Sequence, residues 1–578
     1  MEKLTRGFPY KRKADIAFAF LFMLVLAFNI WIVPFSKELT MDEVLYLAIP
    51  HRMLQGDSFL LHEWQMSQMA SFLILPLVRG YIAVFTGTDG IMLVFRYIYV
   101  FFHGLVSLFI FLRLRKTNPF GAAAASLYYQ VFCYANIMAL SYNTMGIGLM
   151  IVTCISLAEY RGGFWEAFLI GLCFAAAVLC CPFLLIAYIV YTLAVFFFAV
   201  SKKTAGEMGA VFNVRTWLSF SSACFLLAAA FFLRMVLFGD IEKLFDALPY
   251  IIVDEEHPQK SFLEWLYSFY GSFYRSCAWF KEIVLASMVL TGLIFLDRKK
   301  RRFRSLWLIC GCIITLAFSV QYLLMYRDSA YLMFPMAILG FFAFLLCEHK
   351  NWRMFWLVYI PGCIFWVCRH MSSNLGFFSI SAAASVNMLA SMIFLAQLLA
   401  QMHGQHKNSR SLSRWVSLAS GGLAIALVCS FFCTMLISRL EGIPEDRAAF
   451  SSGSAKGIEI SRDWVEAMER EYEALAPLRE LEEGNVLYFT EINNLRYLED
   501  EKKSASHSMW ITATSTENSI IALEKMEKYW QMFPEKKPDY VYVAEHLMQD
   551  GQILAFFEDY EYTQMSLDTG VVLCVEWR

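Results

Sequence analysis

Thirteen apolar stretches, each about as long as a membrane-spanning helix, recur along this chain and restrict what it can fold into. A bilayer core takes about 20 apolar residues per helix, and 58% of the 578 residues are hydrophobic. Only 17% are charged, compared with about 25% in a typical soluble domain. These values exclude a disordered chain, a coiled coil and a purely soluble protein of this size. The predicted spans are Ala14–Phe35, Ile91–Leu112, Phe120–Ala139, Tyr142–Leu157, Phe164–Cys180, Phe183–Val200, Trp217–Phe238, Cys277–Leu296, Ser305–Met325, Tyr331–Cys347, Met354–Cys368, Leu375–Gln401 and Trp415–Ile437.

Lysine and arginine are distributed unevenly among the loops that join these spans. If the N-terminus is cytoplasmic, the N-terminus and the loops on its side of the membrane together carry 23 Lys and Arg, whereas the loops on the opposite side carry 8. Cytoplasmic segments of membrane proteins are enriched in these residues. We therefore expect a multi-pass protein of the cell membrane, with a cytoplasmic N-terminus and an extracytoplasmic C-terminal domain.

The charge of the chain divides it into two parts. Residues 439–578 contain 28 acidic and 14 basic residues, a net charge of −14, whereas the remainder has 22 and 34, a net charge of +12. An acidic, water-soluble tail after a basic, lipid-embedded body indicates two domains. We predict a transmembrane domain at 1–438, with long outer loops at 36–90 and 239–276, and an extracytoplasmic domain at 439–578.

The tail has the pattern of a small α/β domain. Asn485–Thr490 and Pro538–Val543 are typical of short strands, and Asn518–Met532 has the apolar spacing of a helix. Tyr560–Trp577 predicts two strands joined by a turn at 568–570. Because this part contains no catalytic sequence motif, we expect an accessory or recognition domain. The predicted fold is an α-helical polytopic membrane protein of about 13 transmembrane helices with a small C-terminal α/β domain.

The first outer loop carries the polar residues that are the best candidates for a reaction site. Asp42 and Glu43 follow the first span directly, and two adjacent carboxylates at a membrane surface are costly to desolvate unless they serve a function. Apolar positions between Val44 and Ile49 recur at helical spacing, which predicts an amphipathic helix lying along the interface. The alternative is that Asp42 and Glu43 only stabilise the N-terminus of this helix.

The rest of this loop adds an ordered series of polar residues and glycines, namely Tyr46, Gly56, Asp57, His62, Glu63, Gly87 and, in the second span, Arg96. Together with Asp42 and Glu43, the series resembles the first loop of the polytopic GT-C glycosyltransferases, which include protein O-mannosyltransferases and aminoarabinose transferases. The thirteen spans and the C-terminal domain are similar to the aminoarabinose-transferase layout. Unlike many members, the chain has no Lys-Pro-Pro after its acidic stretch and no acidic residue at 140–143.

The resemblance implies an integral membrane enzyme that moves a sugar from a polyprenyl-phosphate-linked donor to a hydroxyl acceptor at the outer membrane face. It implies that Asp42 takes the acceptor proton with support from Glu43, and that Tyr46 contributes to the donor site. The acceptor stays open among a lipid, a glycan, a cell-wall polymer and a protein. A lipid-phosphate leaving group requires cations, although arginines at span ends are commonly structural. The candidate cations are Arg96, Arg234, Lys281, Arg275 and Arg327.

The sequence fixes no cofactor, and other functions stay open. His62 and Glu63 could meet His257 of the second outer loop, and a mixed His and carboxylate set suits a divalent metal ion. Solvated loop charges are the alternative. A lipid-linked sugar flippase or transporter, expected to carry charges in mid-span, and an O-antigen-type ligase or polymerase are the competing functions. The lipid bilayer and the lipid-linked donor are the expected partners, and no nucleic acid is expected.

Overall fold

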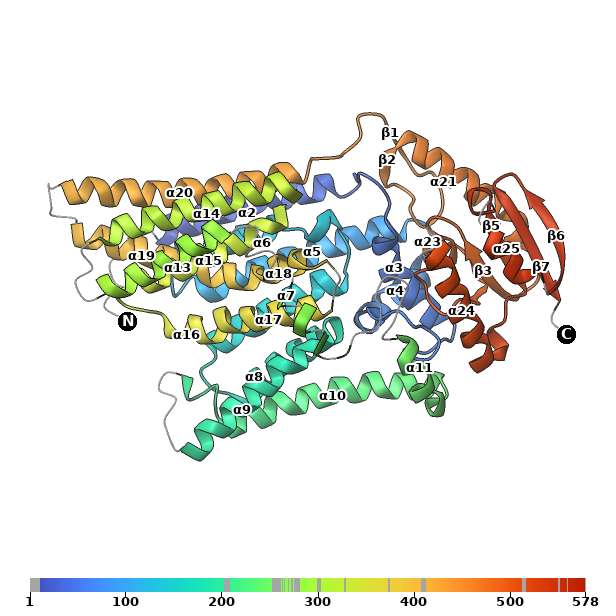
Figure 1. Ribbon diagram of the computed structural model, residues 1–578, viewed down its shortest axis with the longest axis horizontal. Helices are drawn as coiled ribbons and strands as arrows, with labels where there is room; N and C mark the ends of the chain where they lie inside the picture. Colours follow the sequence, from blue (N-terminus) through green and yellow to red (C-terminus); the bar gives the residue numbers. More distant parts are fainter. Residues whose placement is uncertain are drawn as a thin grey trace.

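The structure is a computed structural model that describes residues 11–201, 208–251, 281–298, 303–326, 329–372, 375–406, 412–511, 516–548, 551–558 and 560–576, together with 261, 263–264, 266–268, 270–271 and 274. Most of the described chain is helical. Long helices run side by side along one axis of the molecule, and the β-strands lie at the end that holds the C-terminus (Figure 1).

The apolar helices follow the hydropathy of the sequence, and each of the thirteen predicted spans contains at least part of one. Ten helical segments in the described residues are long and apolar enough to cross a membrane, as expected of a multi-pass membrane protein. This number is smaller than thirteen because α6, α8, α13 and α15 have 17 residues or fewer. The helices of this part are α2 (Lys11–Ile32), α5 (Ile91–Leu114), α6 (Pro119–Val131), α7 (Tyr142–Glu159), α8 (Phe164–Cys180), α9 (Leu185–Ser201), α10 (Val214–Phe238), α11 (Leu244–Ile251), α13 (Lys281–Asp297), α14 (Arg304–Tyr326), α15 (Met333–Leu346), α16 (Trp352–Met354), α17 (Ile360–Met371), α18 (Phe377–Ala383), α19 (Ser385–His406) and α20 (Leu412–Ser438).

The first outer loop is itself helical. It forms α3 (Met41–Leu54) and α4 (Ser71–Phe85). With the preceding turn, α4 is one of the ten apolar segments, although no span was predicted there. The helix predicted here is confirmed as α3, but its predicted amphipathic character is wrong, because α3 is buried on every side from Glu43 to Pro50. It lies between the membrane helices and the C-terminal strands (Figure 1). Its apolar residues face protein on both sides rather than lipid on one.

The C-terminal region, residues 439–578, holds both β-sheets. The larger has the strand order β4-β3-β5-β7-β6, in which β3 is parallel to β4 and β5, and β7 is antiparallel to β5 and β6. The central strands β3 and β5 are apolar and almost fully buried, as expected where both faces of a sheet are covered. The predicted strands and helix of this region are confirmed. Its elements are β1 (Arg447–Ala449), β2 (Glu459–Ser461), α21 (Arg462–Ala474), α22 (Ala476–Glu480), β3 (Asn485–Phe489), α23 (Asn493–Glu499), β4 (Lys503–Ser504), α24 (Thr516–Met532), β5 (Tyr540–Ala544), α25 (Gly551–Phe557), β6 (Glu561–Leu567) and β7 (Gly570–Glu576).

The C-terminal region is joined to the membrane part by a continuous apolar core. Buried side chains of α3, α4 and α5 form one cluster with buried side chains of α21, α23 and β3. Backbone hydrogen bonds cross the same boundary: Gly90 N–H donates to Gly453 at 3.0 Å, and Glu459 N–H donates to Pro34 at 2.8 Å. Because α3 lies in the middle of this core, both parts of the chain fix its position.

Candidate active site

The first turn of α3 carries Asp42 and Glu43. Thr40 caps this helix, since its side-chain oxygen accepts a hydrogen bond from the Glu43 N–H at 3.4 Å. Neither carboxylate is therefore needed as the cap. Successive residues of a helix point about 100° apart, so Asp42 and Glu43 face different neighbours.

Glu43 forms a buried ion pair with Arg96 of α5. Arg96 donates from Nη2 to Glu43 Oε2 at 2.7 Å and from Nε to the other oxygen of the same carboxylate. Its remaining nitrogen, Nη1, donates to the Val33 carbonyl at 3.0 Å. Glu43 is 6% exposed and Arg96 is 2% exposed. This pair holds α3 against α5 and the end of α2, and it occupies the guanidinium that the sequence predicted to bind a donor phosphate.

Asp42 faces a group of tyrosines instead. The Asp42 carboxylate and the Arg369 guanidinium each lie within electrostatic range of the hydroxyls of Tyr46, Tyr134 and Tyr142. The Arg369 carbon Cζ is 5.2 Å from the ring centre of Tyr142 and 5.9 Å from that of Tyr134. Burial raises the pKa of Tyr46 well above its ordinary value, and the charge of Asp42 adds to the rise. We call these five residues the tyrosine–arginine cluster.

Local structure places the members of this cluster. Ser141 caps α7 with a reciprocal pair of hydrogen bonds to Thr144, which fixes the first turn that carries Tyr142 and Asn143. Tyr134 begins a short 3₁₀ turn after α6, where Ala135 and Asn136 both have a positive φ. Arg369 lies in the last turn of α17, which a π-helical turn at Phe355–Tyr359 precedes. Such turns are frequent at functional sites.

Arg369 is a buried cation whose donors are only partly used. It is 1% exposed, and Nη2 donates to the Asn143 side-chain oxygen. Within the part of the chain that the structure describes, its Nε and Nη1 have no hydrogen-bond partner. A buried charge costs several kcal/mol unless it is paired and hydrogen-bonded. An anionic ligand would supply what the described residues do not.

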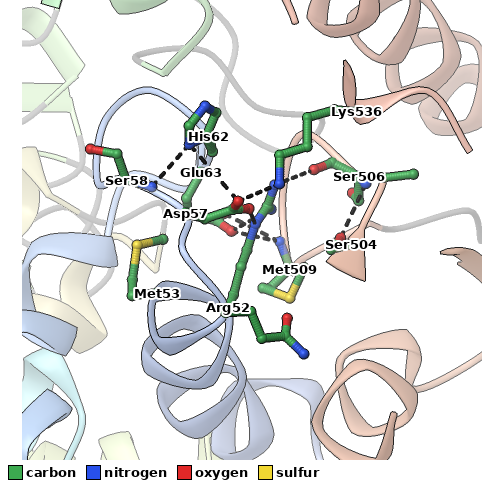
Figure 2. Close-up of polar contacts among 12 residues, drawn as sticks. Arg52, Met53, Asp57, Ser58, His62, Glu63, Ser504, Ser506, Met509 and Lys536 are labelled. Atoms are coloured by element: carbon green, nitrogen blue, oxygen red, sulfur yellow. Dashed lines mark hydrogen bonds and ion pairs between the residues drawn. The ribbon is translucent and has the colours of Figure 1, made fainter. Parts of the chain in front are cut away.

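The later loop residues lie in a second polar cluster, at the other end of α3. Figure 2 shows Arg52 between the carboxylates of Asp57 and Glu63, with Lys536 of the C-terminal region beside Asp57. Arg52 donates to Asp57 at 2.6 Å and to Glu63 at 3.0 Å. Its Nη2 reaches the C-terminal region, donating to the Ser506 carbonyl at 2.7 Å and to the Tyr529 hydroxyl at 2.9 Å. We call this group the Arg52 cluster.

The chain and its charges both shape the Arg52 cluster. Gly56, with a φ of +107°, turns the backbone back after α3 so that Asp57 faces Arg52. Burial opposes the ionisation of Asp57, but Arg52 and Lys536 outweigh it and hold the pKa of Asp57 below its ordinary value. Burial raises the pKa of Glu63, although Arg52 and backbone N–H donors oppose the rise. The cluster joins the first loop to the C-terminal region.

His62 is neutral in this setting. Burial lowers its pKa to about 4. The charge of Asp57 opposes this fall, whereas the charges of Lys536 and Arg52 add to it. Accordingly, its Nδ1 accepts a hydrogen bond from the Ser58 N–H at 2.9 Å. Burial also lowers the pKa of His51 on α3 to about 4.

The predicted metal site is not assembled by the described residues. Glu63 is engaged by Arg52 and the Met509 N–H, and His62 by Ser58. Among the residues that the structure describes, no group of three or more His, Cys, Asp or Glu side chains is arranged to hold a metal ion. The third predicted ligand, His257, lies outside the described residues, so the structure gives the positions of two of the three predicted ligands.

The remaining predicted cations lie away from the tyrosine–arginine cluster or outside the described residues. Arg234 donates to the Met53 carbonyl at 2.8 Å, and its Cζ lies 3.3 Å from the ring centre of Phe238. Lys281 is exposed and pairs with Glu282 at 3.8 Å. Arg275 and Arg327 are not among the described residues.

Sequence reasoning missed Arg369 and Asn143. Arg369 directly follows the predicted span Met354–Cys368, on the side of the membrane expected to hold the two long loops. This position could have indicated Arg369. The polar turn at Tyr142-Asn143, which was noted only because it lacks an acidic residue, could have indicated Asn143.

Comparisons with known proteins find similarity of architecture only. No family model matches the chain, and no curated protein matches it by sequence. The archaeal oligosaccharyltransferase AglB from Archaeoglobus fulgidus, in complex with an inhibitory peptide and a dolichol-phosphate, is 12% identical, with 98% of this chain and 75% of that chain covered and a TM-score of 0.47. The oligosaccharyltransferase of the same organism with a tethered acceptor peptide is 11% identical, with 97% and 74% covered and a TM-score of 0.43.

A third solved structure, ArnT from Cupriavidus metallidurans in the apo state, is 11% identical, with 97% of this chain and 98% of that chain covered and a TM-score of 0.40. These neighbours are GT-C glycosyltransferases, the superfamily that the first-loop motif resembles. Similarity of this degree assigns neither a family nor an activity, so the function proposed below rests on the site itself.

The neutral His62 predicts a loss of stability in acid. A histidine whose pKa falls from about 6.5 to about 4 on burial contributes fully above pH 6.5, and its contribution is lost as the pH falls towards 4. At pH 5 the loss for one such residue is about 2 kcal/mol. We expect the thermal unfolding midpoint of the purified protein to fall between pH 7.5 and pH 5, and to fall less in His62→Gln.

The difference between wild type and His62→Gln isolates this histidine, because the raised pKa of Glu63 acts in the opposite direction and is common to both proteins. His546→Gln, at an exposed histidine of the C-terminal region, is the matched control and should keep the full fall. An equal fall in wild type and His62→Gln would show that His62 does not carry the effect.

Proposed function

We propose that this chain is a membrane glycosyltransferase that moves a sugar from a polyprenyl-phosphate-linked donor to a hydroxyl of an acceptor. One observation carries the proposal. The buried Arg369 faces the same three tyrosine hydroxyls as Asp42 and has Nε and Nη1 without partners among the described residues. A carboxylate base and a cation in one buried cluster are the groups that displacement from a lipid phosphate requires.

In the proposed reaction the acceptor oxygen attacks the anomeric carbon of the donor sugar. The bond from that carbon to the phosphate oxygen breaks, and the lipid phosphate leaves with the electron pair. Asp42 takes the proton of the acceptor hydroxyl as the new bond forms. Arg369 binds the phosphate oxygens, for which its planar fork of N–H groups is suited. A direct displacement of this kind inverts the anomeric configuration.

An apolar cavity near the cluster supports a lipid-linked donor. Its volume is about 430 Å³, and its lining is apolar apart from a few hydroxyls, in the size range of small-molecule sites. Phe377 lines the cavity, and the next residue, Phe378, has its ring 5.0 Å from that of Tyr134. Consecutive residues of α18 therefore contact the cavity and the tyrosine that Arg369 approaches. Its other lining residues are Val284, Ser287, Met288, Thr291, Phe318, Phe334, Ile338, Phe341, Phe342 and Tyr359.

The competing functions make different demands on Asp42. A lipid-linked sugar flippase or transporter would bind the same phosphate with Arg369 but would need no proton acceptor. An O-antigen-type ligase would also transfer sugar, from a lipid carrier to a lipid acceptor. It therefore differs from the proposed function in its substrates and not in its chemistry. Variants of Asp42 therefore separate transfer from transport.

Asp42→Asn should abolish transfer while the protein stays folded and still binds polyprenyl phosphate. Asparagine has the size of aspartate but cannot accept the proton, and general-base catalysis contributes about 10²–10⁴-fold. Transfer is measured from a radiolabelled polyprenyl-phosphate sugar to envelope fractions. Full transfer by the Asn variant would remove Asp42 as the base. A wild-type protein that exports the lipid-linked sugar without transferring it, together with equal export by the Asn variant, would favour the flippase.

Arg369→Gln should weaken the binding of polyprenyl phosphate by at least about tenfold, because a hydrogen bond to a charged group contributes about 1.5–3 kcal/mol. Arg369→Lys should lose less, and polyprenol, which lacks the phosphate, should bind all three proteins equally. Titration calorimetry in detergent gives these affinities. The thermal midpoint should not fall in Arg369→Gln, since the change removes a buried charge that has few partners.

The matched control is Arg113→Gln, which removes a half-exposed arginine paired with Glu166 at 3.3 Å near the far end of α5. It should bind polyprenyl phosphate as wild type does. If Arg369→Gln behaved like this control, Arg369 would have no part in donor binding.

We also propose that the cluster faces the outer side of the membrane, as the distribution of Lys and Arg indicates. A cysteine at the exposed position Glu524 should react with a membrane-impermeant thiol reagent in intact cells, and a cysteine at the exposed Phe303 should react only after lysis. The reverse pattern would invert the orientation.

A further inference from the structure

The C-terminal region contacts the backbone next to Asp42. Asn494 of α23 donates from its side-chain nitrogen to the carbonyl of Met41 at 2.7 Å, and Met41 is the residue that precedes Asp42. Asn494 is fully buried, at 0% exposed. A hydrogen bond from another part of the chain therefore acts on the first turn of the helix that carries the proposed base.

The helix that supplies this hydrogen bond is itself firmly held. Arg496, two residues further along α23, donates to Glu471 of α21 at 3.0 Å, to Glu499 at 2.6 Å and to the Met468 carbonyl at 3.0 Å. All three interactions lie within the C-terminal region, and Arg496 is 2% exposed. Asn494 thus connects Met41 to a rigid support.

The far end of α3 is held by the same region. Arg52 reaches Ser506 and Tyr529, and the Gln55 side chain donates to the carbonyls of 500, 501 and 502 at 3.3–3.4 Å. Contacts at both ends prevent α3 from shifting along its axis or tilting relative to the C-terminal region. From the membrane side, Glu43 fixes its rotation through Arg96.

We propose that Asn494 is a positioning residue for Asp42, and that the C-terminal region thereby sets the place of the proposed catalytic carboxylate. This inference rests on the proposed function, because it assumes that Asp42 takes the acceptor proton. A misplacement of about 1 Å in a reacting group can cost about 10²-fold in rate. Loss of the Asn494 hydrogen bond should therefore act on the chemical step rather than on the donor phosphate, which Arg369 binds.

The test compares Asn494→Ala with Asn485→Ala. Asn485 makes the same kind of bond in the same region, from its side-chain nitrogen to the carbonyls of Glu535 and Lys537 at 2.9 and 3.0 Å, but both of these carbonyls belong to the C-terminal region rather than to α3. We expect kcat for transfer to fall about tenfold or more in Asn494→Ala with the donor KM unchanged, and both constants to stay near wild type in Asn485→Ala. Thermal midpoints are measured for each, and Asn494→Ser is used if the alanine variant does not fold.

A double-mutant cycle with Asp42→Glu separates positioning from general destabilisation. If Asn494 acts through Asp42, the Asn494 change should cost less than about threefold in kcat once Asp42→Glu has already displaced the carboxylate. Equal losses in both backgrounds, or an Asn494 variant that matches Asn485→Ala, would overturn the inference.

The proposed function fails on a separate result, because it requires Asp42→Asn to be inactive whatever the Asn494 variants do. If Asp42→Asn is inactive and the Asn494 variants match Asn485→Ala, only the positioning role is overturned. If Asp42→Asn retains full transfer, the base assignment fails and the positioning role fails with it.

Discussion

Neutralisation of buried charge is the constraint on which the arrangement of this molecule depends. Arg52 and Arg96 are almost fully buried, and each is matched by carboxylates from the first loop. Removing one partner from such a pair typically costs about 3–5 kcal/mol, because the other charge is left uncompensated. Arg52 is itself part of α3, and Arg96 binds Glu43 of the same helix. The position of α3 relative to α5 and to the C-terminal region is therefore not free to vary without exposing or unpairing a buried ion.

Arg369 differs from these two arginines, and the difference gives it a functional meaning. It is as deeply buried as Arg52, but its one hydrogen bond among the described residues goes to the Asn143 amide, and its Cζ approaches the aromatic rings of Tyr134 and Tyr142. The Asp42 carboxylate acts on the same tyrosine hydroxyls, but two nitrogens of Arg369 keep no hydrogen-bond partner among the described residues. The fold pairs the buried Arg52, Arg96 and Arg496 with carboxylates, but leaves Arg369 with two donor nitrogens unused by the described residues. Such a local departure from complete pairing lowers stability and is typical of binding sites. In the proposed function, the phosphate of a lipid carrier would supply the negative charge and the acceptor oxygens for the unused donors of Arg369.

The sequence allowed the local elements to be predicted but not the contacts between distant ones. Apolar runs located the membrane helices, and alternating or continuous apolar residues located the strands around Val486 and Val541, because these patterns depend on neighbours in the sequence. The surroundings of α3 were misjudged, since its apolar residues were assigned to lipid but are buried in one core with the membrane helices and the C-terminal region. Asp57 was assigned only to the first-loop series and Glu63 to a possible metal site, whereas their partners Arg52 and Lys536 make them part of an interface. Nothing in the first loop indicates a lysine that lies 479 residues away from Asp57.

The two adjacent carboxylates that began the functional argument have separate roles because of helix geometry. Asp42 and Tyr46 are four residues apart and lie on one face of α3, so the face that meets Tyr142 also carries Asp42. Glu43 is rotated from them by about 100°, which turns it toward Arg96 and the end of α2. The environment then divides the pair: Glu43 is bound in an ion pair and stabilises the helix, while Asp42 shares its surroundings with neutral tyrosines and Arg369. Two carboxyl groups with such unlike surroundings are suited to unlike tasks, which is why we assign the proton transfer to Asp42 alone.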